Sequence, residues 1–134
     1  KSRPKAIRKI ETQPFPGFPT DMQAQTTALL SIADGSSIMV ENLFESRFKY
    51  TVQLTKMGAD ITVKDRVAMI KGVKELSPAF LRADDLRGGA ALVIAALAAK
   101  GTSEIEGVHH IDRGYCRIED DLKSLGADII RKIT

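Results

Sequence analysis

The side chains in this sequence that are best suited to chemistry are acids and arginines at the starts of predicted helices. Asp21 and Arg87 lie at the starts of one pair of helices, and Arg47 and Arg113 lie near the starts of another pair. Guanidinium groups bind phosphate and carboxylate through paired hydrogen bonds. A carboxylate near a helix N-terminus is stabilised as the anion, so it orients a hydroxyl group better than it acts as a strong base. Together these residues predict a site for anionic groups.

The correspondence between these positions comes from an internal repeat. Gly35 matches Gly101, and after a two-residue insertion the run 58–61 recurs, residue for residue, as 126–129. Four consecutive matches at nearly the same offset as the surrounding ones are hard to attribute to composition. We therefore interpret the chain as two copies of one structural unit, in which equivalent positions face one region.

The first copy is predicted to be a βαβαββ unit, from its apolar periodicity and its glycine and proline punctuation. Thr20 is expected to be the N-cap of the first helix, and Gly35 and Gly58 to follow the ends of the two helices. The expected elements are, in order, a strand at 3–12, a helix at 21–33, a strand at 36–42, a helix at 46–57, and a hairpin of strands at 59–63 and 67–70.

The second copy repeats this order and stops one strand short. Its first helix, Leu86 to Ala99, is apolar on every side, so we expect it to run through a core, with helices inside and strands outside. Its glycines and alanines allow close approach of neighbouring backbones. The expected elements are a strand around 75–83, helices at 86–99 and around 115–124, a strand at 102–107, and a last strand that reaches residue 133.

Composition limits the classes of protein that fit. A chain of 134 residues suits one domain, and 43% hydrophobic with 28% charged residues argues against disorder. A net charge of +3 favours anionic ligands without the basic patches of a nucleic-acid binder. The longest apolar stretch is too short to span a bilayer. One cysteine, Cys116, and a start that is no signal peptide predict a reducing, cytoplasmic setting.

Five segments in order, within residues 3–131, resemble the UDP-N-acetylglucosamine 1-carboxyvinyltransferases of the enolpyruvyl transferase family. They are Pro16–Gln25, Glu45–Phe48, Met57–Ala59, Asp85–Ala90 and His110–Tyr115. The resemblance implies an inside-out α/β barrel built from six βαβαββ units, three in each of two domains. Residues 1–134 would then be part of the C-terminal domain, with two of its three repeats at about 3–72 and 73–134.

The same resemblance implies an activity. The family transfers the enolpyruvyl group of phosphoenolpyruvate to the 3-hydroxyl of UDP-N-acetylglucosamine and releases phosphate, which is the first committed step of peptidoglycan synthesis and so bears on cell shape and cell division. It needs no metal or organic cofactor. Its site lies between the two domains, so this chain is expected to need the N-terminal domain and to be inactive alone. No nucleic-acid or membrane partner is expected.

Roles for individual residues also follow from the resemblance. Asp21 would contact the attacking sugar hydroxyl as a general base, and Arg113 is the other expected catalytic residue. Arg47, Arg87 and Arg113 would line the cleft, Asp85 would bind substrate, and Leu43 would contact the nucleotide. From the residues alone, a helix-capping acid is the preferred interpretation of Asp21, and Leu43 is equally a core residue. Each arginine could form a surface ion pair with Glu45, Asp85 or Asp112.

The histidines and the cysteine predict no further functional site. His109 and His110 are adjacent on an expected strand and have no third ligand, so we expect structural histidines and no metal site. Cys116 is expected to be inert. The alternatives to the main interpretation are a fragment of 5-enolpyruvylshikimate-3-phosphate synthase, which shares fold and reaction type, and a non-catalytic module that binds anions or RNA.

Overall fold

The computed structural model describes residues 4–14, 16–43, 48–112, 118–124, 126 and 129. Two units follow each other along the chain. We call the part from β1 to β4 the first unit and the part from β5 to α5 the second unit. Both contain a parallel pair of strands joined through a helix, which is the arrangement that the repeat in the sequence predicts.

The first unit contains a four-stranded sheet with the order β1-β2-β4-β3. Strand β2 pairs in parallel with β1, and β4 pairs antiparallel with both β2 and β3. The predicted hairpin is confirmed as β3 and β4, with Asp65 in the left-handed region at a φ of 54° in the turn. The elements are β1 (Lys9–Glu11), the 3-10 helix η1 (Thr20–Met22), α1 (Gln23–Leu30), β2 (Ser36–Val40), α2 (Thr51–Lys56), β3 (Asp60–Lys64) and β4 (Val67–Lys71).

The second unit has a two-stranded parallel sheet, in which β5 and β6 are joined through a long helix. That helix, α3, closely matches the predicted bounds. The elements are β5 (Phe80–Arg82), α3 (Leu86–Ala98), β6 (Glu104–Glu106), α4 (Val108–Asp112) and α5 (Ile118–Ser124). The predicted last strand falls mostly on residues that lie outside the described part of the chain.

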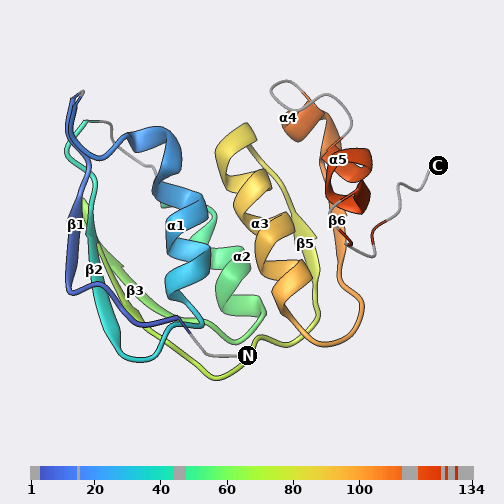
Figure 1. The fold of residues 1–134 in the computed structure, drawn as a ribbon, viewed down its shortest axis with the longest axis horizontal. Helices are drawn as coiled ribbons and strands as arrows, with labels where there is room; N and C mark the ends of the chain where they lie inside the picture. The colour runs from blue at the N-terminus through green and yellow to red at the C-terminus, as the bar shows by residue number, and fades with distance from the viewer. Residues whose placement is uncertain are drawn as a thin grey trace.

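Helices α1 and α3 lie side by side between the two sheets and begin at the same end of the molecule (Figure 1). The buried core spans both units and includes Leu30, Met39, Leu54, Leu81 and Leu92. Burial of such side chains contributes about 1.5 to 3 kcal/mol each, so the core is the main source of stability. Strands outside and helices inside is the layout that the sequence predicts.

Small residues bring α3 close to its neighbours. A methyl group on Gly89 would lie 2.6 Å from a side-chain carbon of Ile111 in α4. A methyl group on Gly88 would lie 3.1 Å from Cβ of Tyr50, which belongs to the first unit. These distances leave no room for larger side chains, so side chains of neighbouring segments pack directly on the backbone of α3 at both glycines.

Burial of α3 differs from the expectation that every side of it is covered. Ile94 and Leu97 are each 39% exposed, and Leu29 on α1 is 49% exposed. The prediction was right for the side of α3 that packs on α1 and α4 and wrong for these positions. The described residues of this chain do not cover them.

Several predicted boundaries are also corrected. Thr20 is not a helix N-cap: it begins η1, and its side chain forms a hydrogen bond to Glu41 instead. Helix α1 ends at Leu30, and the second predicted helix is shorter, at Thr51–Lys56. His109 and His110 lie on helix α4 and not on a strand. No helix among the described residues is long and apolar enough to cross a membrane.

Candidate active site

The starts of the two central helices bring Asp21 and Arg87 together. Asp21 lies in η1, directly before α1, and Arg87 lies in the first turn of α3. Their side chains form an ion pair, with 2.7 Å between Asp21 Oδ1 and Arg87 Nη2. Both remain accessible, since the Asp21 side chain is 65% exposed and that of Arg87 is 39% exposed. Two predicted site residues from different units therefore meet at one surface.

Asp85 begins α3 and is its N-cap. Its Oδ1 accepts a hydrogen bond of 2.6 Å from the backbone N–H of Gly88. The cap fixes the first turn of α3, and with it the position of Arg87, because a side-chain acceptor satisfies one of the free N–H groups at a helix start. Asp85 thus has a structural role that is compatible with the predicted role in substrate binding.

A small cavity separates the two helix starts. It is lined from the first unit by Thr20, Gln23, Ala24 and Tyr50, and from the second unit by Asp85, Arg87 and Gly88. Its volume of about 20 Å³ has room for a single water molecule. A sugar nucleotide cannot enter this cavity, so a ligand of that size has to bind on the accessible side of the Asp21–Arg87 pair.

A buried carboxylate, Glu41, holds the first-unit side of this site. Its Oε1 accepts hydrogen bonds from Thr20 Oγ1 at 2.8 Å and Gln23 Nε2 at 3.1 Å. Its Oε2 accepts from Thr12 Oγ1 at 3.0 Å and from the backbone N–H of Leu43 at 3.1 Å. Burial acts to raise the pKa of Glu41, but these four hydrogen bonds outweigh it and lower the pKa below the ordinary value. Glu41 is therefore an anion at neutral pH.

The hydrogen-bond network continues from Gln23 to Tyr50. The Tyr50 hydroxyl donates to Gln23 Oε1, while the amide group of the same Gln23 donates to Glu41. Burial, aided by the negative charges of Glu41 and Asp85, raises the pKa of Tyr50 and keeps it protonated as a donor. The network thus links the end of β2 to the start of α2 through the start of α1.

The remaining predicted residues fall in two groups. Leu43 is half-buried, and its backbone is bound by Glu41, so it lies near the network. Arg47, Glu45, Arg113 and Cys116 lie outside the described residues. Asp21 and Arg87 therefore lie together as expected, Asp85 lines the same small cavity as Arg87, and the convergence of Arg47 and Arg113 on this place remains a prediction.

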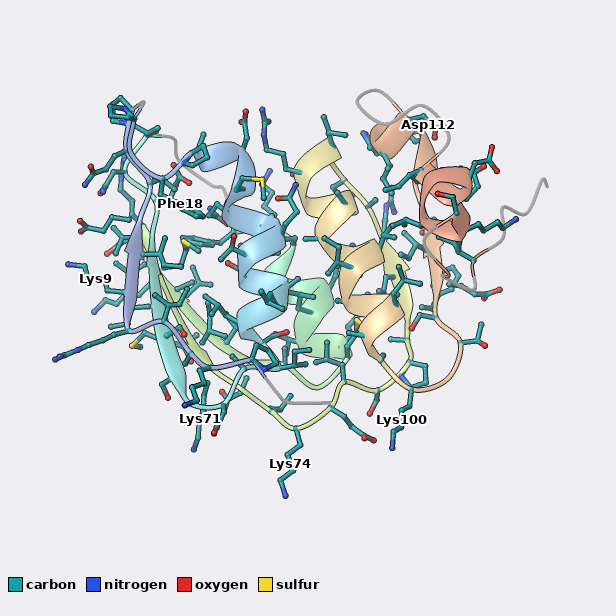
Figure 2. All side chains as sticks on the ribbon, viewed as in Figure 1. Lys9, Phe18, Lys71, Lys74, Lys100 and Asp112 are labelled. Carbon is teal, nitrogen blue, oxygen red and sulfur yellow. The ribbon has the colours of Figure 1, made fainter. Side chains whose placement is uncertain are left out.

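Other charged and metal-binding candidates lie elsewhere. Figure 2 shows Lys71, Lys74 and Lys100 at the edge of the molecule opposite the starts of α1 and α3. His109 and His110 face each other, with ring centroids 4.1 Å apart. Within the part of the chain that the structure describes, no three His, Cys, Asp or Glu side chains form a group that could hold a metal ion.

Glu41, Gln23 and Tyr50 were missed in the sequence. The burial of strand β2 contains a signal for one of them: Ser37 and Met39 are buried, and Glu41 continues this alternation past the end of the strand. Since successive side chains on a strand face opposite sides, a glutamate on the buried side indicates a carboxylate with internal donors.

Comparison with known proteins identifies the family. The model of the EPSP synthase (3-phosphoshikimate 1-carboxyvinyltransferase) family matches residues 1–122, which is most of the chain. The chain belongs to this family. The resemblance found in the sequence is thereby confirmed at the level of the enolpyruvyl transferases.

Curated relatives narrow the resemblance further. UDP-N-acetylglucosamine 1-carboxyvinyltransferase 2 of Caldanaerobacter subterraneus is 58% identical over 129 residues, which are 96% of this chain and 31% of that protein. UDP-N-acetylglucosamine 1-carboxyvinyltransferase of Geobacter metallireducens is 54% identical over the same share of both. The chain spans about a third of the length of these relatives.

A solved structure supports the fold. The crystal structure of the enolpyruvyl transferase NikO from Streptomyces tendae matches with a TM-score of 0.81 and 34% sequence identity, over 92% of this chain and 29% of that one. The predicted fold class, that of the enolpyruvyl transferases, is confirmed.

Proposed function

We propose that this chain forms part of a UDP-N-acetylglucosamine 1-carboxyvinyltransferase and contributes one side of its active site. The observation that carries the proposal is the Asp21–Arg87 ion pair, which joins the starts of two neighbouring helices on an accessible surface. Relatives at 54% to 58% identity that bear this enzyme name give the proposal its substrate, UDP-N-acetylglucosamine.

The proposed reaction adds the 3-hydroxyl oxygen of the sugar to C2 of phosphoenolpyruvate, while C3 takes up a proton and the hydroxyl proton is removed. C3 then loses a proton as the bond between C2 and the phosphate oxygen breaks, so that the C=C bond is restored and phosphate is released. Asp21 would accept a hydrogen bond, and in time the proton, from that hydroxyl. Arg87 would stabilise the negative charge of the phosphate or carboxylate group. The ion pair orients Asp21 and Arg87 relative to each other before substrate arrives.

Asp85, Leu43, Arg47 and Arg113 complete the proposed site. Asp85 would bind substrate with the part of its carboxylate not used to cap α3. Leu43 would contact the nucleotide near the network around Glu41, and Arg47 and Arg113 would add positive charge for phosphoenolpyruvate. Arg113 would also be catalytic, the role that the family resemblance implies for it.

We further propose that residues 3–72 and 73–134 are two repeats of a three-repeat domain that acts with an N-terminal domain. The exposed apolar side chains of Leu29, Ile94 and Leu97 support this division, because a third repeat packed on α1 and α3 would cover them. In such an enzyme the reaction would take place in the cytoplasm, serve peptidoglycan synthesis and so contribute to cell division.

The test uses an enzyme chimaera, in which this chain replaces the segment that it matches in the Caldanaerobacter relative. Phosphate release would be measured with phosphoenolpyruvate and either UDP-N-acetylglucosamine or shikimate 3-phosphate. We expect turnover with the sugar nucleotide and none by the isolated 134 residues. A chimaera that folds but turns over neither acceptor, or prefers shikimate 3-phosphate, contradicts the proposal.

A further inference from the structure

We propose that Glu41 is a positioning residue, which fixes Asp21 relative to Leu43 and thereby sets the affinity of the site for the sugar nucleotide. This inference rests on the proposed function. It concerns a residue that touches none of the reacting groups, because its side chain is 1% exposed. Glu41 would act on the substrate only through the groups that it holds.

The two carboxylate oxygens of Glu41 bind different parts of the site. Oε1 accepts hydrogen bonds from Thr20, which directly precedes Asp21, and from Gln23, which lies two residues after it. Oε2 accepts from the backbone N–H of Leu43, and from Thr12 at the end of β1. A single rigid carboxylate therefore spans the gap between the predicted sugar-hydroxyl contact and the predicted nucleotide contact.

Glu41 also takes the place of a side-chain N-cap at the start of η1 and α1. Neither η1 nor α1 has a side-chain N-cap, and Thr20, which could serve as one, donates to Glu41 instead. Hydrogen bonds to a charged acceptor are stronger than hydrogen bonds between neutral groups. The position of Asp21 consequently depends on a residue from the end of β2.

The hydrogen bonds that Glu41 accepts from Thr12, Thr20, Gln23 and Leu43 all lie within the first unit. Arg87 is held by its own helix start, which Asp85 caps. A change at Glu41 should therefore move Asp21 and Leu43 directly, and should affect Arg87 less, only through its ion pair with Asp21. This asymmetry separates a positioning role from a general effect on stability.

Two variants of the enzyme chimaera test the proposal. Glu41→Gln keeps the length of the side chain but turns one acceptor into a donor that faces donors. Glu41→Asp keeps the charge but is too short to reach both sides. For each we expect the KM for UDP-N-acetylglucosamine to rise about tenfold or more, which corresponds to the loss of about 1.4 kcal/mol, and the KM for phosphoenolpyruvate to change less than about threefold.

The control is a core variant of similar stability, Ile70→Val, or Ile70→Ala where the loss in Glu41→Gln is larger. Ile70 is buried on β4 and makes no contact with substrate in the proposed site. We expect both KM values of the control to stay within about twofold of the parent chimaera, since lost packing lowers stability and leaves the site geometry unchanged.

The outcomes separate the two proposals. An active parent chimaera whose Glu41 variants keep both KM values, or raise both equally, overturns the positioning role and leaves the proposed function standing. A folded parent chimaera without transfer activity overturns the proposed function itself. If Glu41→Gln does not fold, Glu41→Asp decides the question alone.

Discussion

The two helix starts that meet at the candidate site are fixed in different ways. Helix α3 is capped by its own neighbour in sequence, Asp85, through a bond to the N–H of Gly88. The start of α1 has no such cap and is held by Glu41, which lies 21 residues from Thr20 and 18 from Gln23. Arg87 is thus oriented by a cap that is local in sequence, and Asp21 by hydrogen bonds to a residue that is distant in sequence.

The difference determines how a substitution can disturb each helix start. A local cap forms as soon as its helix forms, because donor and acceptor lie within one turn. The Glu41 network requires β1, β2 and α1 to be in place together, since it gathers donors from all three regions. One substitution in the Glu41 network should therefore destabilise the first unit more than the loss of the Asp85 cap destabilises the second.

The largest expected effect comes from Glu41→Leu. Without the carboxylate, the buried amide of Gln23 and the N–H of Leu43 lose their acceptor, and each such loss costs about 1 to 3 kcal/mol. We expect the free energy of unfolding of the enzyme chimaera to fall by about 3 kcal/mol or more, as measured by urea denaturation. A loss below about 1 kcal/mol contradicts the importance of the network.

Asp85→Ala should have an intermediate effect. The loss of the cap on α3 should lower the free energy of unfolding by about 1 kcal/mol. Asp85→Asn is the matched variant, because asparagine caps helices as well as aspartate does. It should restore stability in the same denaturation experiment while it still impairs phosphate release if the charge of Asp85 binds substrate. Equal destabilisation by both variants would show that the cap is not the cause.

Asp21→Asn should have the smallest effect on stability and a large one on turnover. The Asp21–Arg87 pair is exposed, and exposed ion pairs contribute about 0 to 1 kcal/mol. We expect the midpoint of urea denaturation to stay almost unchanged and the kcat for phosphate release to fall at least about a hundredfold. Full activity in this variant would remove Asp21 from the proposed mechanism.

A pH experiment sharpens the comparison further. The folded-state pKa of Glu41 is below its ordinary value of 4.5, so ionised Glu41 stabilises the fold above that pH, and this contribution is lost as pH falls through the folded-state pKa. Glu41→Gln removes that dependence. The loss of unfolding free energy between pH 6 and pH 3.5, values chosen to bracket the reference pKa, should be smaller in Glu41→Gln than in the parent chimaera. The same loss in both would contradict the lowered pKa.

Most of the fold could be predicted because it depends on local patterns. The apolar run in α3, the glycines after the helices and the alternation in the hairpin all act within a few residues. The errors have physical causes. Thr20 looks like an N-cap in sequence, but a buried carboxylate from another strand competes for its hydroxyl group. The histidines follow Gly107, which turns the chain into α4 rather than extending β6.

The site could be predicted only in part. Asp21 and Arg87 were found because the repeat places them at equivalent helix starts, and the helices do lie together. The cap formed by Asp85 is local, but the family resemblance directed attention to substrate binding. Glu41 was missed because its partners Thr12, Thr20 and Gln23 become neighbours only after the sheet and helix have packed.

Gly88 connects these observations. Its N–H binds the cap of the second unit, and its missing side chain admits Cβ of Tyr50 from the first. At this point the packing of the two units depends on the absence of a side chain on Gly88. One added methyl group at Gly88 would push Tyr50 and Asp85 away from α3, close to the ion pair. A larger residue should therefore be tolerated less at Gly88 than at surface positions of α3.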